Sequence, residues 1–137
     1  MKVELQRVNN AFHFEAKNEN NKIINIDASP TIGGNDNGFR PMELLLAGLG
    51  GCSGIDVLHI LKKQKIELED FSIKIEATRK NEQPAIFETI NVLFEVKGEV
   101  DEAKVKRAID LSMEKYCSVT KILEKSATIE YSYKINS

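Results

Sequence analysis

The chain has 137 residues, of which 42% are hydrophobic and 29% charged, and its formal net charge is -2 at pH 7. These values predict one soluble globular domain, residues 1–137, that is large enough to bury a core. They exclude a general binder of nucleic acid or membrane surfaces, because the densest basic run, residues 104–107, is short and fits a solvated helix face.

The first third of the chain alternates apolar and polar residues. Asparagine-rich breaks at residues 9–10 and 18–21 divide it, so we expect three short antiparallel strands joined by hairpins. Residues 29–39 are rich in Gly, Asn and Asp and predict a loop. The N-terminal residues do not resemble a signal or transit peptide, so we expect a cytoplasmic protein whose two cysteines stay reduced.

A long helix is predicted over residues 41–65. Pro41 suits its first turn, and Glu43 complements the positive end of the helix dipole. Residues 44–61 are apolar over nearly the length that spans a bilayer, but Asp56 and several glycines interrupt them, so we expect a core helix. Because the helix is apolar on nearly all sides, one chain cannot cover it, and we predict a homodimer.

The second half of the chain contains three more predicted strands and two helices. Residues 71–80 and 88–98 alternate and predict two long, half-exposed strands. Asp101 is expected to cap a second helix, followed by a short helix over residues 118–125 and a strand over residues 128–135. This order predicts an α+β fold with mostly antiparallel sheets wrapped around a long central helix.

The stretch GLGGCSGIDV, residues 48–57, places four glycines around Cys52 in the middle of the predicted helix. A glycine inside a helix costs roughly 1 kcal/mol relative to alanine. We interpret the glycines as room for another backbone, or a substrate, to approach Cys52. The four positions are Gly48, Gly50, Gly51 and Gly54.

Two cysteines are the candidate chemical groups. Cys52 and Cys117 belong to no C-x-x-C motif, which excludes a thioredoxin-type redox turn. One interpretation is that both are small buried hydrophobic residues. The other is that they are reactive, since Cys117 stands at or just before a predicted helix start, where backbone amides lower the pKa of a thiol.

The polar neighbours of Cys52 on its helix do not predict a catalytic pair. His59 lies ~10 Å farther along the helix axis, too far for direct proton transfer. The charge of Asp56 would oppose thiolate formation, so we expect Asp56 to pair elsewhere. A zinc site lacks the usual close ligand spacing, and we expect neither metal nor cofactor. The ligands of such a site would be Cys52, Cys117, His13 and His59.

A thiolate beside apolar groups needs a positive partner, and two arginines are candidates. Arg7 lies on the first predicted strand, and Arg40 precedes the long helix. Arg40 is ~18 Å along the helix from Cys52, so it would act across a dimer interface or hold Glu43 in place. The alternative is that both arginines are simply solvated.

Two segments carry a family resemblance. RPMELLLAGLGGCSGIDVLHILKK, residues 40–63, and EKYCSVTKILEKSATIEYSY, residues 114–133, resemble the OsmC/Ohr family of osmotically inducible and organic hydroperoxide resistance proteins, in its small OsmC-like branch. The resemblance covers essentially the whole chain. It implies an intertwined homodimer with two active sites at the interface, each holding two cysteines.

The resemblance also implies roles for individual residues. Cys52 would attack the hydroperoxide and become a sulfenic acid, and Cys117 would resolve it as a disulfide that a dithiol reductant opens. Glu43 would orient an arginine beside the thiolate, with Arg40 as the first candidate. This sequence departs from the hydroperoxide reductases in two places: Met42 separates Pro41 from the glutamate, and a serine rather than a proline follows the second cysteine.

Three functions are therefore open at the level of sequence. The first is a peroxiredoxin-like thiol peroxidase that reduces organic hydroperoxides through Cys52 and Cys117. The second is a non-catalytic protein that binds a small apolar ligand on the same fold. The third is a redox-sensing protein whose disulfide changes the shape of the dimer.

Overall fold

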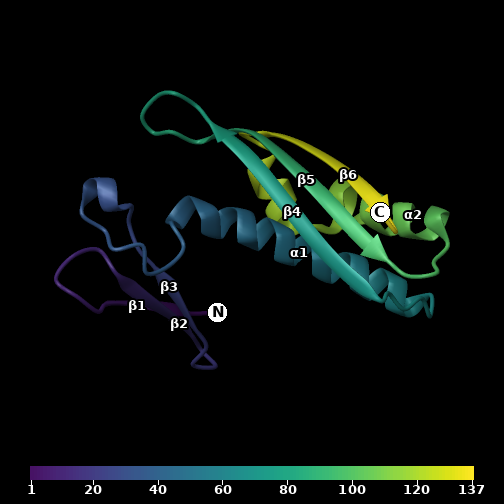
Figure 1. Ribbon diagram of the computed structural model, residues 1–137, viewed down its shortest axis with the longest axis horizontal. Helices are drawn as coiled ribbons and strands as arrows, with labels where there is room; N and C mark the ends of the chain where they lie inside the picture. The colour runs from purple at the N-terminus through teal and green to yellow at the C-terminus, as the bar shows by residue number, and fades with distance from the viewer. The chain divides into compact units, whose positions relative to one another are not determined.

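The computed structural model describes residues 1–137 and contains two three-stranded sheets and one long helix (Figure 1). This confirms the predicted α+β class. The chain divides into two compact units, Met1–Leu46 and Ala47–Ser137. The elements in chain order are β1 (Val3–Arg7), β2 (Phe14–Asn18), β3 (Ile23–Ile26), η1 (Pro30–Ile32), α1 (Pro41–Lys63), β4 (Asp70–Arg79), β5 (Phe87–Lys97), α2 (Glu102–Leu111), η2 (Ser112–Tyr116), α3 (Ser118–Leu123) and β6 (Thr128–Ile135).

The first sheet is the predicted antiparallel set of hairpins, in the order β1-β2-β3. Its register pairs Leu5 with Ala16 and Ala16 with Ile24, so these three side chains share one face. Ala16 is buried, but Leu5 is 56% and Ile24 52% exposed. The apolar face of this sheet is therefore left largely uncovered by the chain itself.

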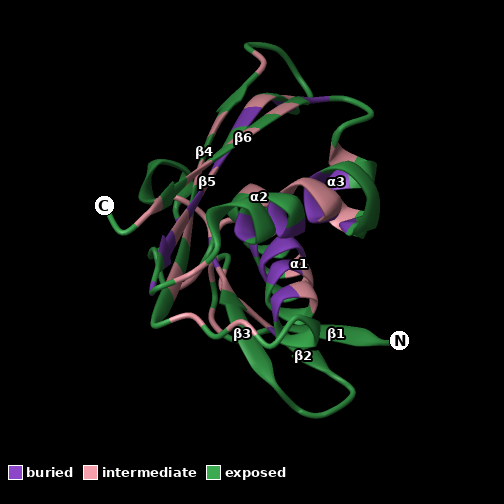
Figure 2. Cartoon of the chain, turned by 90° about the vertical axis from the view of Figure 1, so that its right-hand side faces the viewer, coloured by how far each residue is buried: buried purple, intermediate pink, exposed green.

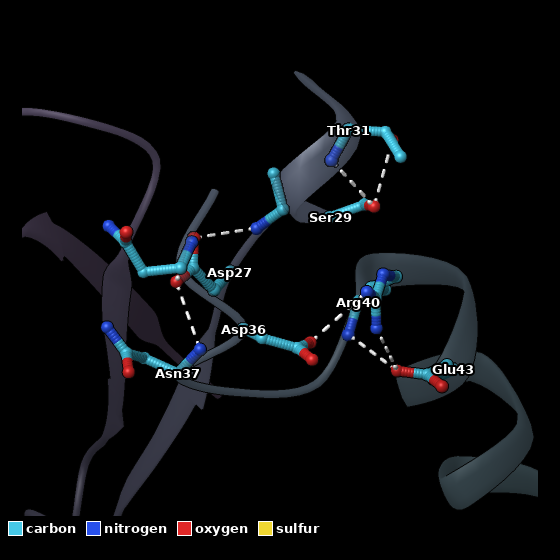
Figure 3. A network of polar contacts seen from close by, with 9 residues as sticks. Asp27, Ser29, Thr31, Asp36, Asn37, Arg40 and Glu43 are labelled. Atoms are coloured by element: carbon cyan, nitrogen blue, oxygen red, sulfur yellow. Dashed lines mark hydrogen bonds and ion pairs between the residues drawn. The ribbon is translucent and has the colours of Figure 1, made fainter. Parts of the chain in front are cut away.

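Asp27 organises the loop between β3 and α1 (Figure 3). Its carboxylate accepts backbone N–H groups of Ala28 at 2.7 Å, Asn35 at 3.2 Å and Asn37 at 3.0 Å. Burial alone would raise the pKa of Asp27, but these three donors outweigh it and hold the pKa below its ordinary value. The predicted loop is thus an ordered connection that leads to α1 at Pro41.

In the second unit, the part of α1 after Ala47 packs against β4. A Cβ atom at Gly50 would lie 3.1 Å from Ile75 Cδ1, and one at Gly54 would lie 2.8 Å from Ile73 Cδ1. These two glycines let the helix lie close to the sheet, so the structure supports the expected close approach at these positions. A Cβ would meet nothing within 4 Å at the other two, Gly48 and Gly51.

α1 is long and apolar enough to span a membrane. Its most apolar window has a mean hydropathy of 1.7, and 28% of that window is buried. The core helix of a globular protein can have the same length and hydropathy. Here Leu49, Val57 and Leu61 are fully buried, and the glycines beside them pack on β4, so this face of α1 belongs to the fold.

The second sheet has the order β4-β5-β6, and its buried face packs against α1 and α2 (Figure 2). In β5, alternate residues are buried as the period-two pattern predicts: Ile90, Val92, Phe94 and Val96. β4 and β5 are antiparallel, whereas β6 runs parallel to β5, so the sheets are mostly antiparallel, as predicted, with one parallel pair. The parallel pair follows from the connection, because residues 98–127 form a helical crossover, which a parallel pair requires.

The crossover contains a π-helical turn that the sequence pattern does not reveal. α2 starts with the predicted cap, since the Asp101 carboxylate accepts the Lys104 N–H. After α2 the helix widens into the π-helical turn η2. There the Cys117 N–H donates a hydrogen bond of 2.8 Å to the carbonyl of Ser112, five residues earlier. π-helical turns of this kind are frequent at functional sites.

We predict that the two kinds of glycine in α1 respond oppositely to added side chains. Gly54→Leu should destabilise the protein by about 1–3 kcal/mol, because the added atoms overlap Ile73. Gly48→Ala should leave stability unchanged or raise it by up to about 1 kcal/mol. Urea unfolding of both variants and the parent protein measures this, and an equal loss in the two variants would contradict it.

Candidate active site

Three reactive side chains meet in the second unit. Cys52 and Asp56 project from α1, and Cys117 immediately precedes α3. The two sulfur atoms and a carboxylate oxygen of Asp56 all lie within 4.8 Å of one another. Both cysteines are free; Cys52 is half-buried, whereas Cys117 is fully buried. The two cysteines singled out by the sequence therefore come together, and an aspartate joins them.

The helix places Cys52 and Asp56 at the edge of its buried face. The two residues are four apart, so they lie one above the other on α1. On one side of them is the stripe that packs in the core, and on the other is an open stripe of small and apolar residues. The open stripe consists of Gly48, Gly51, Ile55 and Leu58, of which Ile55 is 70% and Leu58 47% exposed. The site therefore borders an uncovered apolar surface.

Ser112, the first residue of η2, fixes the orientation of Asp56. Its hydroxyl donates to Asp56 Oδ2 at 3.1 Å and also lies 3.3 Å from the Ser53 carbonyl. Asp56 thus has the separate partner that we expected, and it also lies beside the two thiols. The four-residue spacing between Cys52 and Asp56 could have indicated from the sequence that Asp56 lies beside the thiol. No sequence feature near Ser112 indicated that it would bind Asp56.

The environment of Cys117 opposes ionisation of its thiol. Burial raises the pKa of Cys117, and the interaction with Cys52 raises it further; hydrogen bonds from Thr120 lower it without cancelling the rise. The Thr120 N–H, 3.4 Å from Cys117 Sγ, is the helix-terminal amide expected to activate the thiol. The predicted lowering is therefore wrong in direction, because burial outweighs the hydrogen bonds from Thr120.

A cavity of about 430 Å³ adjoins the site. It lies between α1 and the α2–η2 segment, and Asp56 is the residue that both the cavity and the cysteine cluster share. Its walls combine apolar side chains with one carboxylate, one ammonium group and one imidazole. The lining residues are Asp56, His59, Ile60, Lys63, Leu111 and Tyr116. A volume of this size holds a small organic molecule.

Arg40 and Glu43 interact with each other in the first unit (Figure 3). Glu43 Oε1 accepts the Arg40 backbone N–H at 2.8 Å, and the Arg40 guanidinium lies 3.1 Å from Asp36 and 3.9 Å from Glu43. Glu43 therefore caps the start of α1 from its third position. Its pairing with Arg40 matches the expectation that these two residues hold each other, while their approach to Cys52 stays a prediction.

The remaining candidate residues have other partners. The Arg7 side chain donates to the Ala11 carbonyl at 2.9 Å, and His13 hydrogen-bonds Asn25 at 2.8 Å. His59 lines the cavity but is not among the groups around the sulfur atoms. Of the four-ligand zinc site that we considered from the sequence, the second unit therefore brings together the two cysteines but not His59.

Comparison with known proteins identifies relatives of the whole chain. The family model described as OsmC-like protein matches residues 33–132. Protein YhfA of Escherichia coli strain K12 is 45% identical over 101 residues, which cover 73% of this chain and 75% of YhfA. A hypothetical protein from Aquifex aeolicus VF5, known as a crystal structure, is 36% identical with a TM-score of 0.85, covering 98% of this chain and 95% of that one.

A more distant structure carries a functional name. The organic hydroperoxide resistance protein OhrB of Bacillus subtilis is 19% identical with a TM-score of 0.67, and the match covers 97% of this chain and 96% of that one. At this identity the likeness shows the fold. Two neighbouring thiols on this fold support a redox-related role.

We predict that the two thiols differ in their rate of alkylation. Because Cys117 is buried and its pKa is raised, its thiolate forms less readily than that of an ordinary thiol, so iodoacetamide at pH 7 should modify the more accessible Cys52 first. Raising the pH should then increase the rate at Cys117. Peptide mass mapping over time measures both rates. Faster modification of Cys117 at pH 7 would contradict the prediction.

Proposed function

This chain belongs to the OsmC-like protein family, and we propose that it is a thiol-dependent peroxidase that reduces organic hydroperoxides through Cys52 and Cys117. The observation that carries the proposal is the pair of free thiols within 4.8 Å of each other, next to a cavity whose walls are partly apolar. A disulfide has an S–S length of about 2.05 Å, so rotation of the two side chains would have to close the remaining gap.

Cys52 is the attacking residue in this proposal, because it is the more accessible of the two thiols. Its thiolate attacks the terminal oxygen of the hydroperoxide, and an S–O bond forms as the O–O bond breaks. The alkoxide leaves and takes up a proton to become the alcohol. Cys52 is thereby oxidised to the sulfenic acid, and the peroxide is reduced.

Cys117 is the resolving residue. Its sulfur attacks the sulfur of the Cys52 sulfenic acid, forms the disulfide and displaces hydroxide, which leaves as water. Cys117 loses its proton in this step, and that proton joins the displaced hydroxide to form the water. An external dithiol reductant opens the disulfide by exchange and restores both thiols. We place the protein in the cytoplasm, where such reductants keep thiols reduced.

The cavity supports organic rather than inorganic peroxides as substrates. Ile60, Leu111 and Tyr116 supply apolar surface that hydrogen peroxide would not use. An alkyl or aryl group bound there would lie beside Asp56, and so beside the two thiols. Burial of such a group is worth about 0.8 kcal/mol for each methylene removed from water.

We further propose that the protein is a homodimer in which Arg40 of a second copy supports the Cys52 thiolate. Two uncovered apolar faces favour this assembly: one face of the first sheet, with Leu5 and Ile24, and the open stripe of α1, with Ile55. Such faces usually mark an interface. In this arrangement Glu43 positions the arginine through the interaction described above.

The cavity also favours a second candidate function. Its size fits a small, largely apolar ligand, so the protein would bind such a ligand without redox chemistry if its thiols proved inert. Native mass spectrometry of the freshly purified protein tests this function directly. A stoichiometric bound molecule together with unreactive thiols would favour binding over peroxidase activity.

We predict that peroxide oxidises the reduced protein in two defined steps. Titration with cumene hydroperoxide, followed by intact mass, should remove two hydrogen atoms from each parent chain. The Cys117→Ser variant should accumulate a sulfenic acid that dimedone traps, and Cys52→Ser should not react. The parent protein should react faster with cumene hydroperoxide than with hydrogen peroxide. Unchanged thiols in the parent protein, or a trapped sulfenic acid only in Cys52→Ser, would contradict the proposal.

We predict that Ile55→Glu converts the dimer to monomers, because it places a charge in the open stripe of α1. Ile122→Glu is the matched control: Ile122 is 66% exposed on α3, as Ile55 is 70% exposed on α1, but it lies outside the stripe. Sedimentation velocity of the two variants and the parent protein measures the assembly. A monomeric parent, or equal dissociation in both variants, would show that α1 is not the interface.

A further inference from the structure

We propose that the reduced site is also a binding site for a thiophilic divalent cation of the Zn²⁺ class, held by Cys52, Asp56 and Cys117. The inference concerns the same two thiols as the proposed function, but it requires no peroxidase chemistry. It rests on the donor atoms that the fold brings together and on the groups that hold them.

The donor atoms are close enough to share one ion. They lie within 4.8 Å of one another, and two sulfur atoms that each lie 2.3 Å from a tetrahedral zinc are about 3.8 Å apart. A closure of about 1 Å is within the reach of side-chain rotation. Cys52 and Asp56, one turn apart on α1, supply two adjacent ligands, and Cys117 supplies a third from the opposite segment.

The donor types select the class of metal. Two thiolates favour soft or borderline ions such as zinc over magnesium or calcium, and a carboxylate is an ordinary third zinc ligand. Three protein ligands leave a fourth position, and the adjoining cavity reaches Asp56, so a water molecule has room to occupy that position. This is the arrangement of an open zinc site rather than a closed structural one.

Two of the three proposed ligands, Asp56 and Cys117, already accept a hydrogen bond that holds them in place. The Ser112 hydroxyl donates to Asp56 Oδ2 at 3.1 Å, and the Thr120 N–H donates to Cys117 Sγ at 3.4 Å. Outer groups of this kind orient metal ligands and raise the affinity for the ion. A bound cation would attract all three groups at once and so offset their mutual repulsion when they are ionised.

The consequence is that metal binding and disulfide formation exclude each other. Binding of Zn²⁺ to two thiols and a carboxylate releases two protons and changes no oxidation state. Coordinated sulfur is held away from peroxide and from the other sulfur. Conversely, the disulfide removes two of the three ligands. A cation would therefore hold the pair reduced, and oxidation would release the cation.

The test is a titration of the reduced full-length protein with Co²⁺ as a spectroscopic substitute for zinc. We expect one ion per chain, thiolate-to-cobalt charge-transfer bands, tetrahedral visible bands, and loss of all of them when Zn²⁺ displaces the cobalt. The protein oxidised to its disulfide should bind none. A reduced parent protein without these bands, or equal binding by the disulfide form, would overturn the proposal, and neither result depends on a variant.

Variants then identify the ligands through competition with a chromophoric zinc chelator. Ser112→Ala should weaken zinc binding roughly 10- to 100-fold by releasing Asp56, and Asp56→Asn should weaken it at least as much. His13→Ala is the control, since this histidine hydrogen-bonds Asn25 in the first unit and has no role in the proposed site, and it should leave the affinity unchanged. An unchanged affinity in Asp56→Asn, or a loss only in His13→Ala, would refute the assigned ligand set.

The two proposals fail separately. Cobalt bands in a protein whose metal-free thiols resist peroxide would retain the cation site and reject the peroxidase. Rapid peroxide oxidation of a protein that shows no cobalt bands would do the reverse.

Discussion

The close packing of α1 on β4 is the constraint on which the rest of the site depends. Gly50 and Gly54 allow the helix to lie against Ile73 and Ile75, and this contact sets the rotation of the helix about its own axis. One residue corresponds to about 100° of rotation. In the observed setting, Cys52 stands at the edge of the buried face. A different setting would bury Cys52 in the core or turn it toward the open stripe.

The site combines three groups that repel one another when they are ionised. Two thiols and a carboxylate within 4.8 Å cannot all be ionised without strong repulsion unless a positive charge is present. An arginine from a second copy and a bound metal ion both meet that requirement, and they lead to different chemistry. A guanidinium leaves the sulfur free to attack, whereas a metal ion occupies it. The nature of the nearby cation therefore decides whether the thiols act as nucleophiles or as ligands.

The features that could be predicted from the sequence are those with a local cause. The alternation in residues 88–98 predicted the buried side of β5, and the apolar run predicted α1. The direction of β6 could not be predicted, because alternation marks the face of a strand and not the direction of its partner. The raised pKa of Cys117 was also missed, since the helix start is visible in the sequence but the burial of the thiol is not.

The candidate site shows the same division. Cys52 and Cys117 could be selected from the sequence through the family resemblance, and the spacing of Asp56 from Cys52 placed it on the same helix face. The hydrogen bond from Ser112 to Asp56 joins residues 56 apart in the sequence, so only the folded chain reveals it. The exposed Leu5, Ile24 and Ile55 likewise became evident as uncovered surface only once the register of the first sheet and the packing of α1 were known.

The π-helical turn makes the site sensitive to how tightly one short segment is wound. η2 holds about one residue more per turn than an α-helix, and the Cys117 N–H reaches back to Ser112 because of it. If the same residues wound as an ordinary α-helix, the Cys117 N–H would reach the Met113 carbonyl instead, one residue later. Cys117 would then be rotated by about 100° from its present direction. A substitution that tightened this turn without changing the length of the chain would therefore separate the two sulfur atoms while leaving the rest of the fold in place.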